Sequence, residues 1–317
     1  MRSTSPTGST PRIKRLPLEK RLLKALGRST FWWMSLCAGL LGARQVEFWG
    51  KSLGSLFFKV SRRHATITLK NLEYAFPEKS SEERMAIAKK VFVDFSIEGF
   101  QFFRLLGMNK ETISNLVEAK GFENIDAALS KGKGCILLTA HYGNWELLAR
   151  KLTILGYKIN VIARDSDDPG MTGMTTKIRE NAGYRVFDRD QPIIGAFRAL
   201  KKNECLGILP DQNESGGIFV DFFGRPAKTA TGPAVLSLKS GAAIVPVFNY
   251  RVGRDKYICE AFPALVFEPS GDNEKDIQEL TALVTKSIEE QIRKKPEHWL
   301  WLHNRWKLSH EAANETK

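Results

Sequence analysis

The chain has 317 residues, of which 43% are hydrophobic and 26% are charged. This composition is enough to bury a substantial core, so it excludes a disordered or fibrous protein and fits one large domain with an appendage. The net charge of +13 indicates an anionic partner surface, which is either nucleic acid or the headgroups of a membrane.

Residues 1–28 form the first segment and carry more than half of that charge. They contain eight Lys or Arg residues and one Glu, a net charge of +7. The Ser, Thr and Pro residues of the first eleven positions predict disorder. We therefore expect a basic, partly disordered N-terminal tail.

Residues 29–64 form an apolar and aromatic segment. Its first part, "FWWMSLCAGLLGA" at Phe31–Ala43, is shorter than the about 20 residues that a free membrane span needs. Apolar residues continue beyond Arg44 and Glu47, unlike the end of a secretory signal peptide. Tryptophans near both ends and basic residues on both flanks favour a membrane-associating helical segment on the cytoplasmic leaflet. The alternative is a helix packed on the domain core.

A long helix is predicted after Pro77. Ser80 and Glu83 form a capping box, and apolar residues then recur at helical spacing. Glu98 lies in the most hydrophobic part of this helix, "FSIEGFQFF". It is either a solvated surface residue, which is the commoner case, or a buried acid and therefore a candidate site residue.

From residue 134 the pattern changes to strands that alternate with helices, which predicts an α/β fold. The predicted strands cover residues 135–139, 158–163, 184–187, 206–209, 217–222, 243–249 and 257–267. The predicted helices cover residues 144–155, 172–181, 193–202, 231–240 and 276–294. We expect a mixed central sheet flanked by helices within one domain over residues 65–308, followed by a polar tail at 309–317.

His141 and Glu146 lie where the first of these strands meets the next helix, in "ILLTAHYGNWELL". The carboxyl ends of strands are where α/β folds place their sites. Within one helix, residues five apart would point about 140° away from each other. If His141 instead precedes the helix, Glu146 in the first turn reaches back to the imidazole, fixes its tautomer and leaves the other nitrogen as a base. The alternative is a structural histidine at a helix end.

No nucleophile accompanies this pair. No serine lies in a G-x-S-x-G elbow, the sharp turn between a strand and a helix. The scattered cysteines show no C-x-x-C pair or metal-ligand spacing, which argues against disulfides and a zinc site and favours a reducing compartment. The simplest nucleophile is therefore a hydroxyl of the substrate itself, deprotonated by His141.

Other candidate site residues follow further along the chain. Asp211 and Gln212 come after another strand, so they are expected at the same edge of the sheet as His141. Thr231 and Gly232 open a helix whose free backbone amides could bind an anion or a developing oxyanion, or they form an ordinary helix start. Arg164 and Arg179 are candidates for binding phosphate or carboxylate groups; the alternative is surface ion pairs.

Several motifs in order resemble the late lipid A acyltransferases, the lauroyl/myristoyl transferase family. They are "NLEYAFPEKSSEER" at Asn71–Arg84, "HYGNWE" at His141–Glu146, "LPDQN" at Leu209–Asn213, "IFVDFFGRPAKTATGPA" at Ile218–Ala234 and "PEHWLWLHNRWK" at Pro296–Lys307. The resemblance covers nearly the whole chain beyond the tail. One departure is "RDSDDPGM" from Arg164, where the family usually has a proline directly after the arginine.

The resemblance implies a membrane-bound enzyme at the cytoplasmic face of the bacterial inner membrane. Its expected reaction moves a fatty acyl group from acyl carrier protein, or alternatively from acyl-CoA, to a hydroxyl of an anionic glycolipid. His141 would be the general base and Glu146 its partner, Arg164 or Arg179 would hold the polar part of the substrate, and Asp211 would lie in the same site. No metal, cofactor or acyl-enzyme is implied.

The sequence leaves three alternatives open. The first is the same chemistry on a lysophospholipid or another lysolipid. The second is a thioesterase-like hydrolase in which His141 activates water. The third is a non-catalytic lipid-binding or nucleic-acid-binding protein, although the basic residues adjoin a tryptophan-rich apolar segment and no nucleic-acid recognition motif is present.

Overall fold

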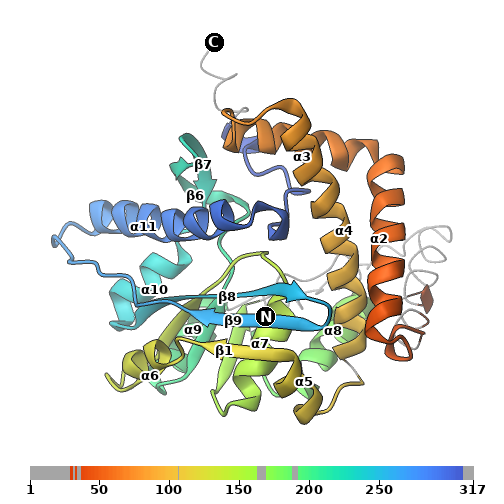
Figure 1. Ribbon diagram of the computed structural model, residues 1–317. Coiled ribbons are helices and arrows are strands. Elements are labelled where there is room, and N and C mark those ends of the chain that lie inside the picture. Colours follow the sequence, from red (N-terminus) through yellow and green to blue (C-terminus); the bar gives the residue numbers. More distant parts are fainter. Residues whose placement is uncertain are drawn as a thin grey trace, which may run out of the picture.

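The computed structural model describes residues 29–30, 33, 37–105, 107–162, 169–187 and 192–309. Its centre is one seven-stranded sheet with helices on both faces (Figure 1). The strands, in the order in which they neighbour one another, are β1 (Val117–Lys120), β9 (Lys256–Ala261), β8 (Ala243–Gly253), β2 (Cys135–Leu138), β5 (Cys205–Ile208), β3 (Ile159–Ile162) and β4 (Arg185–Phe187). The tails at 1–28 and 310–317 and the residue Arg164 lie outside the described residues.

The sheet is mixed, which confirms the predicted α/β architecture. Strands β8, β2, β5, β3 and β4 run parallel to one another, and β9 and β1 run in the opposite direction. Successive residues of β2 face opposite sides of the sheet. Ile136 and Leu138 belong to one hydrophobic core and Leu137 to a second core on the other face, as the alternation of side chains along a strand requires.

The helices that cover the sheet come from segments with one apolar side. They are α5 (Lys110–Leu116), α6 (Glu123–Leu129), α7 (Trp145–Ile154), α8 (Pro169–Asn181), α9 (Pro192–Lys201), α10 (Gly232–Ser240) and α11 (Asn273–Lys294), followed by the short helix η1 (Pro296–His298). A separate antiparallel hairpin consists of β6 (Asn213–Phe222) and β7 (Arg225–Thr229). The sequence pattern predicted α7 to α11 within a few residues and missed α5, α6, β1 and β7, whose short lengths leave little periodicity to detect.

The predicted strand over residues 257–267 is too long, because β9 ends at Ala261. Pro263 has no N–H group and cannot continue a regular ladder. Phe262 and Leu265 still donate backbone hydrogen bonds to Pro246 and Ile244 of β8. The segment therefore follows β8 irregularly.

Helix α4 (Ser81–Leu105) begins at the predicted capping box. The backbone N–H of Ser80 donates to Glu83 Oε2 at 2.8 Å, and the backbone N–H of Glu83 donates to Ser80 Oγ at 3.2 Å. These bonds satisfy two backbone donors that the first turn of a helix leaves free. They fix the start of a 25-residue helix that forms one wall of the site described below.

Helix α2 (Ala43–Val60) lies along α4, and α3 (Arg62–Ala75) connects the two (Figure 1). Val46, Gly50 and Gly54 form the buried side of α2. Its other side exposes several large apolar residues, namely Phe48, Trp49, Leu53, Leu56 and Val60. Within the described part of the chain, no helix has both the length and the apolar character that crossing a membrane requires.

We expect Gly54→Ala to destabilise the fold, because the backbones of α2 and α4 touch there. A Cβ atom at this position would lie 2.6 Å from the carbonyl oxygen of Phe92 and from Val93 Cα. Backbone atoms cannot move aside cheaply, so the unfolding free energy should fall by about 1–3 kcal/mol. Thermal and urea unfolding would measure this. The matched control is Gly173→Ala in α8, where a Cβ meets nothing within 4 Å; an equal loss there would contradict the packing argument.

Candidate active site

His141 lies just after the carboxyl end of β2, the central strand between β8 and β5. The turn that follows needs a glycine. Gly143 has φ +57°, and a Cβ atom there would lie 2.0 Å from the carbonyl oxygen of Asn249. Asn144 then caps α7, because its Oδ1 accepts a hydrogen bond from the backbone N–H of Leu147 at 2.9 Å. His141 therefore precedes the helix, as the spacing predicted.

The imidazole of His141 is held by Asp211. Its Nδ1 lies 2.9 Å from Asp211 Oδ1, and the backbone N–H of His141 donates to Asp211 Oδ2 at 2.9 Å. The indole N–H of Trp299 donates to the same Oδ2 at 2.8 Å. Asp211 comes from the loop after β5, which pairs with β2 in register, so the two strand ends bring the residues together. Among the described residues, His141 Nε2 has no protein partner.

These contacts set the protonation of both groups. Burial alone raises the pKa of Asp211, but the positive charge of protonated His141 and the three donors outweigh it and lower the pKa below its ordinary value. Burial lowers the pKa of His141, but the charges of Asp211 and Glu146 and the Asp211 hydrogen bond outweigh it and raise the pKa above 6.5. The arrangement is an ionised carboxylate that orients an imidazole and stabilises its charged form.

The expectation that Glu146 holds the imidazole needs correction. Glu146 lies in the first turn of α7, but its carboxylate is bound by α8 and the residue before β4. Arg179 Nη2 lies 2.5 Å from Glu146 Oε1, and the hydroxyl of Tyr184 donates to Oε2 at 2.5 Å. His141 Nδ1 is already occupied by Asp211. The charge of Glu146 contributes to the raised pKa of His141, after Asp211.

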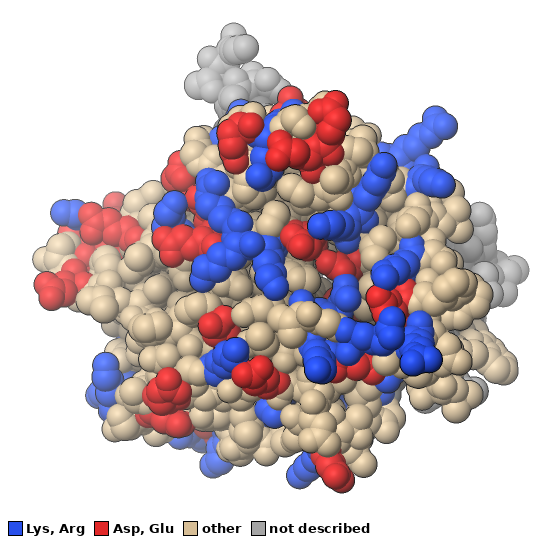
Figure 2. Space-filling view, viewed as in Figure 1, with Lys and Arg blue, Asp and Glu red and all other residues tan. Residues whose placement is uncertain are grey.

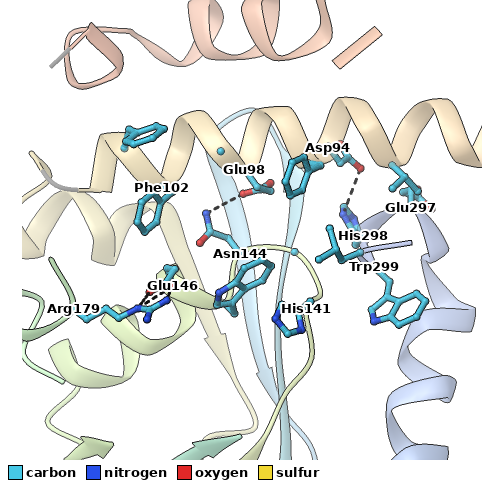
Figure 3. Close-up of a pocket in the computed structure, with 17 residues that line it drawn as sticks. Asp94, Glu98, Phe102, His141, Asn144, Glu146, Arg179, Glu297, His298 and Trp299 are labelled. Atoms are coloured by element: carbon cyan, nitrogen blue, oxygen red, sulfur yellow. Dashed lines mark hydrogen bonds and ion pairs between the residues drawn. The ribbon is translucent and has the colours of Figure 1, made fainter. Parts of the chain in front are cut away.

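A cavity of about 350 Å³ adjoins His141 (Figure 3). One wall is α4, which contributes mostly apolar and aromatic residues, and the opposite wall is the turn that carries His141, Asn144 and Glu146. Arg179 closes one side and the C-terminal segment 297–300 the other. The lining residues are Val91, Asp94, Phe95, Glu98, Gly99, Phe102, Phe103, His141, Gly143, Asn144, Trp145, Glu146, Arg179, Glu297, His298, Trp299 and Leu300.

Glu98 is a largely buried acid in this wall, which fits the second of its two sequence-based interpretations. Its side chain is 11% exposed. Its Oε2 accepts hydrogen bonds from Asn144 Nδ2 at 3.0 Å and from the Tyr257 hydroxyl at 2.9 Å. Burial raises the pKa of Glu98 to about 7. Arg251 pairs with Asp94 and lies 3.4 Å from Glu98 Oε1, so two carboxylates share one guanidinium where α4 meets the sheet.

The C-terminal segment contributes residues that sequence reasoning missed. The backbone N–H of Leu300 donates to the carbonyl of His141 at 2.9 Å, and the N–H of Gly143 donates to that of His298 at 2.8 Å. The segment is therefore paired with the His141 turn, and Trp299 reaches Asp211. The sequence signalled this segment in two ways, by the run of aromatic residues in "PEHWLWLHNRW" and by its resemblance to a family motif.

The remaining predicted residues divide into two groups. Asp211 contacts His141, and Arg179 lines the cavity beside Glu146. Gln212, Thr231 and Gly232 do not line it. Thr231 is the N-cap residue of α10 without a side-chain cap bond. The substrate-binding roles of Gln212, Thr231 and Gly232 therefore stay predictions.

Comparison with known proteins identifies relatives along most of the chain. The model of the family described as "Bacterial lipid A biosynthesis acyltransferase" matches residues 20–308. The lipid A biosynthesis lauroyltransferase of Escherichia coli (strain K12) is 30% identical over 268 residues, 83% of this chain and 86% of that protein. The palmitoleoyltransferase of the same strain is 27% identical over 266 residues, 82% of this chain and 84% of that protein.

A more distant relative carries a different name. The phosphatidylinositol mannoside acyltransferase of Mycobacterium tuberculosis (strain ATCC 25618 / H37Rv) is 26% identical over 217 residues, 65% of this chain and 66% of that protein. The family match spans the strand ends, the His141 turn and the C-terminal segment, and it confirms the resemblance found in the sequence motifs. The chain therefore belongs to the bacterial lipid A biosynthesis acyltransferase family.

Proposed function

We propose that this protein transfers a fatty acyl group from acyl carrier protein to a hydroxyl of a lipid A precursor, with His141 as the general base. The observation that carries the proposal is the His141–Asp211 pair, which lies at a cavity with an apolar helical wall. Family membership supports acyl transfer in lipid A biosynthesis. The acyl donor, the general base and the membrane location go beyond family membership and are our proposal.

The geometry supports direct transfer. With Asp211 accepting from Nδ1–H, the Nε2 atom of His141 is the unprotonated nitrogen and takes the proton of the acceptor hydroxyl. The oxygen then attacks the thioester carbonyl carbon, the C–S bond breaks, and the thiolate leaves as a thiol after receiving the proton from the imidazolium. Among the described residues, no Ser, Thr or Cys lines the cavity, so the substrate's own hydroxyl is the simplest nucleophile. Arg179 is our candidate for contacting the polar part of the substrate.

The charge of the surface supports the proposed partners. Lys and Arg side chains gather around the turn between β8 and β9 on the face shown in Figure 2, where Lys51, Arg254 and Lys256 are exposed. Acyl carrier proteins are acidic, and the lipid A precursor is a phosphorylated lipid in an anionic leaflet. Basic surfaces attract both partners at low ionic strength.

We further propose that α2 rests on the cytoplasmic face of the inner membrane. Its apolar residues Phe48, Trp49, Leu53 and Leu56 are exposed on the side that faces away from α4. Interfacial helices bury such a face in the headgroup region, and adjacent basic residues add attraction to anionic lipids. The +7 charge of residues 1–28 lies directly upstream in the sequence.

A double variant, Leu53→Glu with Leu56→Glu, tests this surface. Removing one leucine from the membrane interface should weaken the free energy of membrane binding by about 1.5–3 kcal/mol. Binding to phosphatidylethanolamine/phosphatidylglycerol vesicles should therefore fall by at least about 10-fold. Vesicle co-sedimentation measures the binding. Val266→Glu changes an even more exposed apolar residue away from α2 and should leave binding unchanged. Equal loss in both variants, or no loss in the double variant, would contradict the assignment of α2.

The reaction is tested by transfer of radiolabelled acyl groups in detergent. Wild-type protein is given acyl carrier protein thioester or acyl-CoA, with a tetraacylated, Kdo-bearing lipid A precursor as acceptor. A more highly acylated lipid formed from the carrier protein thioester supports the proposal. Release of free fatty acid without acceptor would make the protein a hydrolase instead.

The second candidate function is acyl transfer to another lipid. The mycobacterial phosphatidylinositol mannoside acyltransferase matches two thirds of this chain, so the same scaffold occurs with a different named acceptor. A parallel assay with lysophospholipids and mannosylated phosphatidylinositol separates the two. Transfer to one of these lipids, with none to the lipid A precursor, would keep the chemistry and replace the acceptor.

A further inference from the structure

The α4 wall of the cavity is interrupted at Gly99. Phe95, Gly99 and Phe102 follow one another along the side of α4 that lines the cavity. Among the lining residues that the structure describes, Phe95 and Gly99 alone are exposed, and we therefore place the mouth of the cavity beside them. A Cβ atom at Gly99 would meet nothing within 4 Å. Packing therefore does not require a glycine at this position, and the missing side chain leaves an opening in the wall.

The opening has the character expected of a passage for a hydrocarbon chain. Phe95 and Phe102 flank it, and it lies on the wall across the cavity from His141 (Figure 3). The same helix packs against α2, whose outer face exposes apolar residues. A chain that starts at the reacting carbonyl near His141 and extends along this wall would leave through an apolar exit.

The acyl chain of the donor is the substrate group that needs this space. A chain delivered by a water-soluble carrier must leave water during transfer, and burial of each methylene is favourable by about 0.8 kcal/mol. The chains of a membrane lipid acceptor already lie in an apolar environment. The apolar part of the cavity therefore suits the donor chain better than the acceptor.

We propose that Gly99 keeps the α4 end of the acyl cavity open and so sets the longest acyl chain that the enzyme transfers efficiently. This inference rests on the proposed acyl transfer. A branched side chain at position 99 would fill the gap between Phe95 and Phe102 and shorten the space available to the chain. Short chains, which do not reach the gap, would be unaffected.

The test is a graded series, Gly99→Ala and Gly99→Leu, assayed with decanoyl, dodecanoyl, tetradecanoyl and hexadecanoyl carrier protein and one acceptor. We expect Gly99→Leu to lower kcat/KM for the hexadecanoyl donor at least about 10-fold relative to the decanoyl donor, compared with wild type, because one methylene in a fitted pocket already discriminates about 10- to 200-fold. Gly99→Ala should shift the profile in the same direction by less.

Gly173→Leu is the matched control. It places the same side chain inside α8 at another exposed glycine with nothing within 4 Å of its Cβ, and it does not line the cavity. Its chain-length profile should equal that of wild type. Thermal unfolding of all variants checks folding, and the Ala variant should be at least as stable as wild type because glycine weakens a helix interior.

The outcomes are distinguishable. An unchanged length profile in Gly99→Leu, or an equal loss with every donor, would overturn the inference while acyl transfer itself stands. A higher KM for the acceptor with an unchanged donor profile would assign the opening to the acceptor lipid and also overturn it. If wild-type protein transfers no donor at all, the proposed function fails, and the inference fails with it.

Discussion

We expect the His141→Ala variant to lose acyl transfer by about 10²- to 10⁴-fold in kcat, the usual contribution of a positioned general base. The acceptor hydroxyl would then have to lose its proton to water during the attack. Binding of the acyl donor should change little, because the cavity wall on α4 stays in place. Single-turnover transfer of a radiolabelled acyl group measures the chemical step directly.

His64→Ala controls for the general effect of removing a histidine. His64 lies in α3, where its ring contacts the Ser61 hydroxyl at 2.8 Å, and it does not line the cavity. It should keep wild-type activity. Asp211 in the His141→Ala variant retains the backbone N–H of residue 141 and the indole of Trp299, so the fold should survive. Residual activity within a few-fold of wild type would remove His141 as the base.

Local patterns predicted most of the fold because they reflect local physics. The capping box at Ser80 fixes the start of α4 through groups three residues apart. The strands from 135 onward are runs of apolar residues bounded by turns, and α11 repeats its apolar residues at helical spacing. The short elements β1 and α6 lack such periodicity. They form because β1 pairs with β9 and because buried residues of both elements belong to one of the two hydrophobic cores.

The contacts within the site depend on which strands lie side by side, and spacing does not encode that. Strand β5 pairs with β2 although the segment that includes β3 and β4 separates them in the chain. Asp211 therefore reaches His141 from 70 positions away, while Glu146, five positions away, faces Arg179. Local reasoning selected the nearer carboxylate. The rule that strand ends meet at one edge of the sheet correctly placed Asp211 in the site. It could not decide whether Asp211 or Glu146 binds the imidazole.

Glu98 is the other residue for which the commoner sequence-based interpretation differs from the structure, and its burial explains the difference. Glu98 lies in an apolar run of α4, and an isolated acid in such a run is usually solvated. Here the sheet supplies Arg251 and Tyr257, and the turn that carries His141 supplies Asn144. These three partners come from β8, β9 and the start of α7. No pattern within the helix could have predicted them.

The Asp211→Asn and Glu146→Gln variants should both lose activity, but by different routes. Asp211 accepts from the Nδ1 side of the imidazole, which leaves Nε2 unprotonated to act as the base. An asparagine can present its NH₂ group instead and favour the other tautomer. We expect kcat to fall by about 10²- to 10⁴-fold in Asp211→Asn, with the donor KM nearly unchanged.

The pH profile separates the two roles. The proposed base, His141, would work as neutral imidazole, so wild-type activity should rise with pH through a pKa above 6.5, raised by the charge of Asp211 and, to a smaller extent, of Glu146. Removing the Asp211 charge leaves burial as the dominant effect, which lowers the pKa of His141. The acidic limb of kcat/KM should therefore move to lower pH in Asp211→Asn. It should move less in Glu146→Gln.

Glu146→Gln acts mainly on Arg179. The carboxylate receives the guanidinium and the Tyr184 hydroxyl, and a neutral amide leaves that partly buried cation without its counter-charge. We expect the unfolding free energy to fall by about 1–3 kcal/mol and KM to rise as Arg179 loses its position in the cavity wall. If instead Glu146→Gln lowers kcat as strongly as Asp211→Asn, with the acidic limb displaced equally, then Glu146 orients the imidazole during turnover. The His141–Asp211 contact would in that case describe only the resting enzyme.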